Sequence, residues 1–142
     1  NPYSSEGIPM KDLTLLKEGE LKAIHGNARF AYYLGVEPTG IYSAVKLDNG
    51  TKAFEEMKKE PYLYVVSFSD FSMDSLSGYF GGEIRLGYES DGKTRQAVTS
   101  GSLSGNYGKV LKNMKFSKET RQINNFIVPC AVLLEDVSIA GC

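Results

Sequence analysis

The chain has 142 residues, of which 42% are hydrophobic and 23% are charged, so it has the composition of a globular domain that buries a core without disulfides or metal. Sixteen basic residues against seventeen acidic ones leave a formal net charge of −1, which argues against nucleic acid as a direct partner. The longest apolar run, residues 126–134, is interrupted by Pro129 and is far shorter than the roughly 18 residues of a membrane-spanning helix, so no membrane partner is expected.

The first elements in chain order are a hairpin and a helix. Residues 12–26 alternate as two short strands around a tight turn at Glu18-Gly19. Residues 27–35 predict a short helix, because Asn27 is a good N-cap, Gly35 is a good C′ residue and the apolar residues between them fall at helical spacing.

A loop, a strand and a second helix follow. Proline and glycine predict a loop over residues 36–42, and residues 43–51 can form a strand. Residues 52–60 predict a helix that Thr51 caps and Pro61 stops.

The second half of the chain is rich in β-branched and aromatic residues. Residues 62–71 predict a strand. After Gly82 another strand alternates, with one side carrying Ile84, Leu86 and Tyr88 and the other carrying Glu83, Arg85 and Gly87. Asp91-Gly92 predicts a hairpin turn, and residues 94–106 are expected to return alongside the preceding strand. Residues 107–114 predict a short helix, and residues 126–141 predict strand in two pieces around Pro129.

About seven strands and three short helices are therefore expected. This pattern predicts an α+β fold, a predominantly antiparallel β-sheet domain with a few short helices, over residues 1–142 as a single domain. The two cysteines, Cys130 and Cys142, are too few for a disulfide framework and predict a reduced, cytoplasmic protein. The chain starts at Asn1 without an initiator methionine or a signal peptide, so we expect a domain of a larger protein.

The stretch TSGSLSGNYGK, residues 99–109, has three serines and three glycines. Such a loop could cradle a phosphate at the start of the following helix, but the Walker pattern and the dinucleotide fingerprint are both absent. Residues 101–105 match Gly-x-Ser-x-Gly, but the residues after them are a poor helix start for a nucleophile elbow. The local sequence therefore favours a structural role, in which the glycines let the strand bend and let the next helix pack closely.

The residues for catalysis or metal binding are sparse. His25 is the single histidine, which favours a structural or merely exposed role. Zinc needs three or four ligands, and one histidine with two distant cysteines matches no familiar spacing. No His-Glu-x-x-His helix is present. We therefore expect no catalytic residue, no metal ligand and no cofactor in this chain.

Three segments taken in order resemble the C-terminal half of the TldD/PmbA family. They are SSEGIPMKDLTLLKEGELKAIHGNARFAYYLGVEPTG, GYFGGEIRLGYESDGKTRQAVTSGSLSGN and PCAVLLEDVSIAG. Members of that family were once called modulators of DNA gyrase and are described as zinc peptidases that trim or mature peptides. The resemblance covers nearly the whole chain, and its specificity lies in the succession of segments rather than in one motif.

The resemblance implies that the catalytic histidines lie elsewhere. The family's zinc motif, His-Glu-x-x-x-His, is absent from this chain. In the TldD branch a cysteine in a glycine-rich segment completes the metal site, whereas the matching residues 113–125 here contain neither cysteine nor glycine. Cys130 stands before the last strand region, where the PmbA (TldE) branch has a similar cysteine. These features point to the non-catalytic PmbA-like branch, although a buried structural role for Cys130 or a diverged relative would also fit.

The leading hypothesis is a domain that helps to enclose an extended peptide substrate and that pairs with a TldD-like subunit or with itself as a dimer. The zinc is then implied for the catalytic partner. Sheet edges suit this role, because a peptide can add as a strand through main-chain hydrogen bonds. The candidate peptide-binding residues come from the glycine-rich stretch and are Ser100, Gly101, Ser102, Ser104, Gly105 and Asn106.

The alternative is a β-rich protein-interaction scaffold with no peptidase role. Its anchors would be exposed aromatic residues such as Tyr32, Tyr33, Tyr42 and Tyr79. A phosphate- or nucleotide-binding module is the third hypothesis. It rests only on the glycine-rich stretch.

Overall fold

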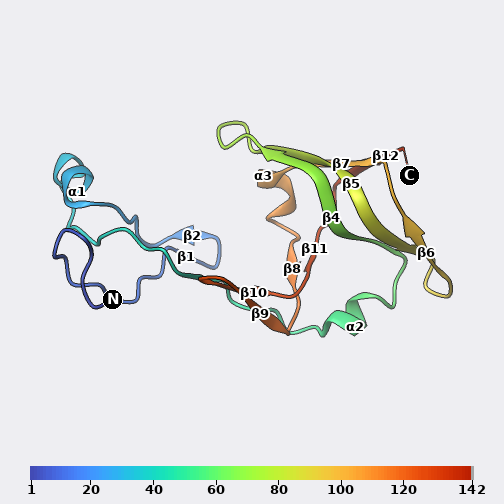
Figure 1. Ribbon diagram of the computed structural model, residues 1–142, viewed down its shortest axis with the longest axis horizontal. Coiled ribbons are helices and arrows are strands. Elements are labelled where there is room, and N and C mark those ends of the chain that lie inside the picture. Colours follow the sequence, from blue (N-terminus) through green and yellow to red (C-terminus); the bar gives the residue numbers. More distant parts are fainter. Residues whose placement is uncertain (142) are drawn as a thin grey trace. The chain divides into compact units, whose positions relative to one another are not determined.

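The computed structural model describes residues 1–141, which divide into two compact units, Asn1–Val45 and the remainder from Lys46 onward. Figure 1 shows the elements of both units along the chain. The described residues form twelve strands and three short helices. None of these helices combines the length and the apolar character needed to cross a membrane. The expectation of a single domain over residues 1–142 stays a prediction.

The first unit carries the predicted hairpin. Strands β1 (Leu16–Lys17) and β2 (Glu20–Leu21) pair antiparallel. Glu18 and Gly19 between them have φ values of 53° and 80°, which is the left-handed turn that a two-residue hairpin requires. The hairpin prediction is therefore confirmed, with strands shorter than the alternating pattern suggested.

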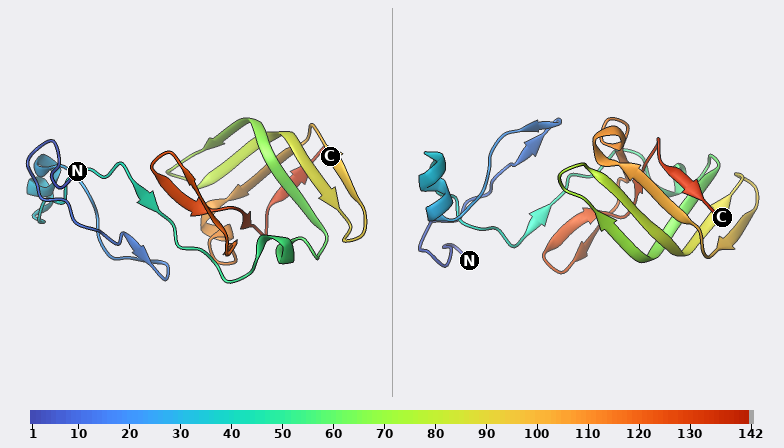
Figure 2. Two further views of the ribbon diagram at one scale, coloured as in Figure 1. Left: turned by 60° about the horizontal axis from the view of Figure 1, so that its bottom comes forward. Right: turned by 90° about the horizontal axis from the view of Figure 1, so that it is seen from above.

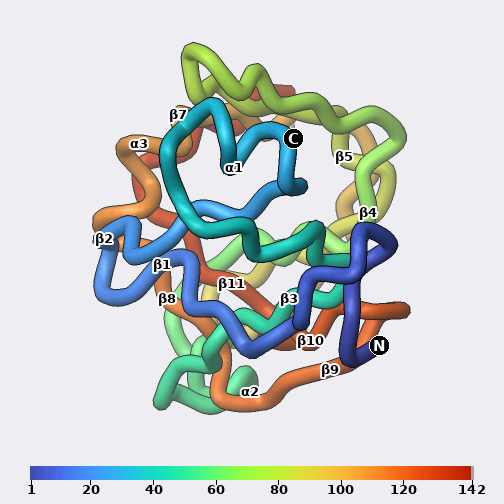
Figure 3. Tube along the Cα trace, turned by 90° about the vertical axis from the view of Figure 1, so that its left-hand side faces the viewer, coloured from blue at the N-terminus to red at the C-terminus, as the bar shows by residue number. Residues whose placement is uncertain are grey.

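Helix α1 (Ala28–Leu34) of the first unit, whose turns can be followed in Figure 3, is as predicted. Both of its predicted caps are also confirmed. The Asn27 side chain accepts the backbone N–H of Phe30 at 3.0 Å, and Gly35 adopts φ 66° at the C-terminus. A contact distant in sequence adds to the N-terminal cap, since Glu6 Oε2 accepts the N–H of Ala28 at 3.0 Å. Negative charge at a helix N-terminus is favourable, so Glu6 stabilises the helix that Asn27 begins.

The second unit is organised by a five-stranded antiparallel sheet. Its long members are β4 (Tyr62–Met73) and β5 (Tyr79–Ser90), which pair along their whole length. On the other side of β5 lie β7 (Ser102–Asn106) and β6 (Arg95–Val98), and β12 (Ser138–Ala140) pairs with the far side of β7. Figure 2 shows β6 and β7 following one another along the same side of β5. The predicted return strand is thus real but is interrupted after Val98.

One face of this sheet carries a cluster of aromatic rings, of which Phe80 is buried and Phe71 is 52% exposed. The rings of Phe68 and Phe71 lie 5.1 Å apart between centroids, and those of Phe71 and Phe80 lie 6.2 Å apart. Helix α3 (Tyr107–Val110) follows β7 directly and contributes Val110, which is fully buried. Asn106 caps α3 by accepting the N–H of Gly108 at 3.1 Å, so the sheet passes into the helix without a loop.

Two further ladders include strands β8 and β9, which the sequence pattern did not predict. Strand β8 (Lys115–Phe116) pairs with β11 (Val132–Leu133), and β9 (Thr120–Ile123) pairs with β10 (Phe126–Pro129), so that β10 and β11 are the two strand pieces predicted around Pro129. Strand β3 (Val45–Lys46), within the strand predicted over residues 43–51, precedes Leu47, whose N–H donates to the carbonyl of Ile127 at 2.9 Å. Strand β8 has two residues and is defined by its pairing with the distant β11, whereas β9 and β10 form a hairpin in which Ile123 stands opposite Phe126.

Ser117 lies at the centre of these ladders and is fully buried. Its hydroxyl donates to the carbonyl oxygen of Glu119 and accepts the N–H of Ala131, both at 3.0 Å. A buried hydroxyl is tolerated only when it is hydrogen-bonded, and this one bonds as donor and as acceptor. Ser117 therefore ties the β8–β9 connection to the start of β11.

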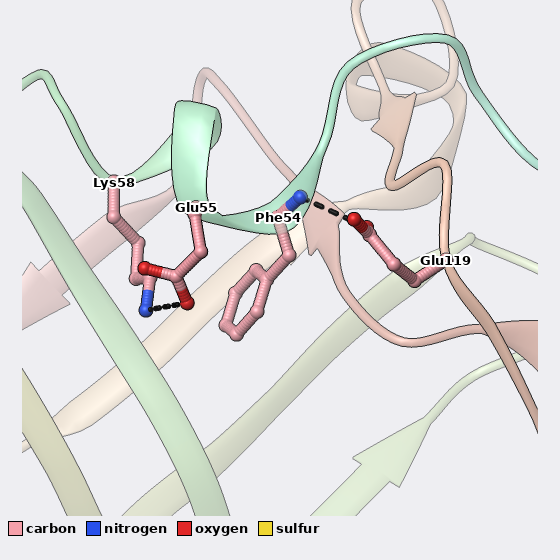
Figure 4. Close-up of polar contacts among 4 residues, drawn as sticks. All are labelled: Phe54, Glu55, Lys58 and Glu119. Carbon is pink, nitrogen blue, oxygen red and sulfur yellow. Dashed lines mark hydrogen bonds and ion pairs between the residues drawn. The ribbon is translucent and has the colours of Figure 1, made fainter.

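Helix α2 (Phe54–Met57) is shorter than predicted, and its N-cap is Ala53 rather than Thr51. Residues 50–52 cannot be helical because they pair with the β8–β9 connection: Gly50 N–H donates to Ser117, and Lys118 N–H donates to Lys52. Glu119 Oε2 accepts the first helical N–H, that of Phe54, at 2.9 Å (Figure 4). The cap of α2 is thus supplied from 65 residues away.

This capping contact predicts a specific dependence of stability on pH. Phe54 N–H, followed by the backbone N–H of Glu119 itself, holds the pKa of the Glu119 carboxyl below its ordinary value of 4.5. A depressed folded-state pKa stabilises the fold above about pH 4.5, and the contribution is lost as pH falls through the folded pKa. We expect Glu119→Gln to lower the urea midpoint at neutral pH and to flatten its decline in acid. Parallel profiles for wild type and variant would contradict this, and Glu60→Gln, an exposed carboxylate outside these contacts, is the control.

Strands therefore dominate and are antiparallel in every named pair, while the three helices are short. The prediction of an α+β, predominantly antiparallel β-sheet fold is confirmed.

Candidate functional site

A groove of about 640 Å³ opens on the large sheet of the second unit, a volume in the range of ligand sites. It lies where β6 passes into β7, beside the middle of β5 and the end of β12. Its lining comes from four segments and comprises Ser69, the run Glu83 to Arg85, the run Thr99 to Ser102, and Ala140 with Gly141.

The groove coincides with irregular pairing on three neighbouring strands. The β4–β5 register shifts twice on β4, at Val66 and at Ser69, and once on β5, at Arg85. On the other side of β5, Ser100 donates its N–H to the carbonyl of Ile84, while Ile84 donates its N–H to the carbonyl of Gly101. Two residues thus oppose one, which is a β-bulge. Bulges bend a sheet and re-aim side chains, so their coincidence explains why the groove forms at this level.

The bulge between β6 and β7 is held in an uncommon backbone conformation. Ser100 and Gly101 have φ values of 72° and 84°, in the left-handed region that favours glycine. The preceding residue anchors the bend, since Thr99 Oγ1 donates to the carbonyl of Arg85 at 3.1 Å. A non-glycine residue held in this region is a strained position of the kind that collects at functional sites.

The same irregularity corrects the predicted alternation along β5. Ile84, Leu86 and Tyr88 were expected on one side, but the bulge at Arg85 shifts the phase of the strand. Ile84 is 1% exposed, as expected, whereas Leu86 is 38% exposed and Gly87 is buried. A one-residue shift moves the next side chains to the opposite face, so Gly87 takes the inward position predicted for Leu86.

The groove carries opposite charges two residues apart on β5. Glu83 and Arg85 both line it and are both exposed. The ion pairs within residues 1–141 join other side chains, namely Lys22 with Glu20, Lys58 with Glu55 and Lys115 with Glu135. Glu83 stands opposite Asp70 across the β4–β5 ladder, an arrangement of like charges that weakens a cross-strand pair. The groove lining therefore carries one acidic side chain, Glu83, and one basic side chain, Arg85.

The structure brings half of the predicted peptide-binding residues together. Ser100, Gly101 and Ser102 line the groove, whereas Ser104, Gly105 and Asn106 continue along β7 away from it. Gly105 accommodates the ring of Phe80, because an added Cβ would lie 2.7 Å from Phe80 Cζ. Asn106 caps α3 and donates to the carbonyl of Ser77 at 3.0 Å. The peptide-binding role of all six residues stays a prediction.

Sequence reasoning did not single out Ser69, Glu83 or Arg85 as site residues. Each lies in a strand with unremarkable alternation, and only the register shifts bring them to the groove. No local motif marks such shifts, although the glycine-rich break at residues 99–101 indicated where the sheet bends.

The remaining candidate residues lie apart from the groove. In the first unit, His25 makes an edge contact with the ring of Tyr42, with centroids 5.8 Å apart. Cys130 has a half-buried free thiol and directly precedes Ala131, whose N–H donates to the Ser117 hydroxyl. Cys142 lies outside the described residues. Within residues 1–141 no three histidine, cysteine or carboxylate side chains are grouped so that they could hold a metal ion. The donor set of the described residues does not fit zinc.

The large sheet also presents strand edges. Within the described chain, β4 pairs only with β5, and β6 pairs only with β5. The outer edge of β6 lies in line with β12, which covers the adjoining β7. An unpaired edge offers main-chain N–H and carbonyl groups to an added strand, and here one such edge adjoins the groove.

Comparisons with known proteins agree with this architecture. The family described as PmbA/TldA metallopeptidase C-terminal domain matches residues 1–141. A candidate modulator of DNA gyrase from Thermotoga maritima is similar over 97% of this chain and 35% of its own, with 26% identity and a TM-score of 0.82. The sequence has no match among curated proteins.

Two further solved structures share the fold. TldE from Thermococcus kodakarensis has a TM-score of 0.86 at 20% identity, covering 99% of this chain and 36% of its own. A candidate modulator of DNA gyrase from Bacteroides thetaiotaomicron has a TM-score of 0.84 at 20% identity, and the likeness covers 100% of this chain and 33% of its own. The chain thus spans about a third of the length of these relatives. With the family matched over residues 1–141, the chain belongs to the PmbA/TldD metallopeptidase family as its C-terminal domain.

Proposed function

We propose that this domain is part of a non-catalytic, PmbA-like subunit, which helps to enclose an extended peptide in a dimer with a TldD-like subunit or with itself. The observation that carries the proposal is the groove beside an unpaired strand edge, in a domain of a metallopeptidase family. Peptidases act on extended chains, and an edge strand binds such a chain through its main-chain groups.

The division of labour follows from the side chains present. The sequence has no His-Glu-x-x-x-His, and its described donors do not fit zinc. In the proposed complex the partner subunit holds the metal and cleaves the peptide, while this domain positions it. A cytoplasmic location belongs to the same proposal and is supported by the low cysteine count.

The scaffold alternative is favoured by one observation. Tyr32, Tyr33 and Tyr79 are 83%, 68% and 65% exposed, as aromatic anchors of an interface would be. Tyr42 is not such an anchor, because it is half-buried and its hydroxyl donates to the carbonyl of Lys11 at 2.6 Å.

Peptide binding without cleavage is the expected result that separates these functions. A fluorescent, unstructured peptide with blocked ends should bind the purified chain in an anisotropy titration and stay intact on mass spectrometry. Cleavage should begin only when a family subunit that carries His-Glu-x-x-x-His is added. Chelator-sensitive hydrolysis by this chain alone would overturn the non-catalytic role, and a failure to bind any peptide would favour the scaffold.

A further inference from the structure

Arg85 occupies the one position on β5 where the strand carries an extra residue, and it lines the groove. Two of the three other arginines make contacts with aromatic rings, and the third, Arg121, lies outside the groove. Arg95 lies over the ring of Tyr88, 3.8 Å from its centroid, and Arg29 lies 5.9 Å from the centroid of Tyr33. Among residues 1–141, Arg85 takes part in no ion pair and in no such ring contact. Its guanidinium is thus available to a ligand in the groove.

The chemistry around Arg85 favours an oxygen acid. A guanidinium presents its N–H groups in a planar fork that matches the two oxygens of a carboxylate. Three hydroxyl groups belong to the same lining: those of Thr99 and Ser69 donate to the carbonyls of Arg85 and Glu83, and that of Ser102 can donate to the ligand. Glu83 in the same lining repels a second negative charge, so a single carboxylate, placed against Arg85, is the best match.

We propose that the groove binds a carboxylate of the extended peptide through Arg85, an inference that rests on the peptide-binding function proposed above. Peptide main chain then lies along the bend between β6 and β7, and Arg85 fixes where along the chain the carboxylate falls. The carboxylate can come from the peptide's C-terminus or from an aspartate or glutamate side chain. Recognition by main-chain groups alone would be indifferent to this charge.

Four fluorescent peptides of one neutral sequence distinguish these cases in anisotropy titrations with the chain. The first ends in an amide, the second ends in a free carboxylate, the third is amidated with one internal glutamate, and the fourth is amidated with glutamine at that position. We expect the second or the third to bind about five- to tenfold more tightly than its uncharged match, with the advantage shrinking in high salt. The better of the two identifies the source of the carboxylate.

Variants assign this preference to Arg85. Arg85→Gln should abolish the preference for the charged peptide over its uncharged match, and Arg85→Lys should keep part of that preference. Glu83→Gln should raise affinity for the charged peptide, because a repelling charge is removed. Arg121→Gln on β9, an exposed arginine outside the groove, is the matched control and should change nothing.

The outcomes separate this inference from the proposed function. Equal affinity for all four peptides would overturn the carboxylate site and leave peptide binding standing. A charge preference that survives Arg85→Gln, or that Glu83→Gln fails to strengthen, would also overturn it. Binding of none of the peptides by the folded wild-type chain would overturn both proposals.

Discussion

Gly50→Ala is expected to lower the free energy of unfolding by at least about 3 kcal/mol, at the upper end of overpacking effects. An added Cβ would lie 1.8 Å from the carbonyl oxygen of Phe116 and 2.8 Å from its carbonyl carbon. Both are backbone atoms, so no side-chain rotation relieves the collision. Gly50 also donates its N–H to Ser117 at 3.0 Å, and the displacement needed would break that bond.

The measurement for Gly50→Ala is a urea titration followed by circular dichroism. Gly26→Ala is the control, because its added methyl would lie 3.9 Å from the nearest atom, Phe30 Cβ, in ordinary contact. A midpoint for Gly50→Ala that equals the Gly26→Ala midpoint would show that the segment from Gly50 to Lys52 is not held against residues 116–118 in solution.

Gly82→Ala is expected to cost about 2–3 kcal/mol, for a related reason within the large sheet. The added methyl would lie 2.3 Å from the carbonyl oxygen of Asp70 and 2.9 Å from Phe68 Cδ1, beneath the cluster of aromatic rings. The collision with the Asp70 carbonyl is with backbone, so the strand would have to move away from β4, and the Phe68 ring would have to shift as well. The movement of the strand would disturb the β4–β5 pairing next to the groove.

The neighbouring glycine supplies a matched control for this effect. At Gly81 the added methyl would lie 3.4 Å from the carbonyl oxygen of Leu103, at the edge of ordinary contact. Since alanine is favoured over glycine within a strand by roughly 0.5–1 kcal/mol, Gly81→Ala should be neutral or slightly stabilising. Thermal unfolding of the two variants side by side tests this, and equal losses would contradict the close packing of β5 on β4.

Within residues 1–141, the elements that could be predicted from the sequence are those with local causes. Helix α1 could be predicted with both ends, because Asn27 and Gly35 act on the helix they adjoin. The hairpin turn at Glu18 and Gly19 is equally local. Strands β4 and β5 are long enough for their composition to identify them. The bend of the sheet at Ser100 and Gly101 was indicated by their glycine- and serine-rich surroundings.

Long-range contacts decided most of the rest. Strand β8 is too short to carry a pattern and exists through its ladder with the distant β11, while β9 pairs with the next strand, β10, in a hairpin that the sequence pattern did not reveal. Helix α2 begins where it does because Glu119 reaches Phe54, whereas Thr51 is in a segment paired with Ser117 and Lys118.

The candidate site divides in the same way. The sequence by itself determined that a Gly/Ser-rich break follows a strand, that metal ligands are sparse, and that the family resemblance covers the chain. Only the tertiary structure placed Ser69, Glu83 and Arg85 around that break. A β-bulge is a mismatch between two paired strands, so it cannot be predicted from the sequence of either strand alone. Propensities and caps act within a few residues, while register is set by packing between distant strands, so the groove and its charges emerge only once the sheet is assembled.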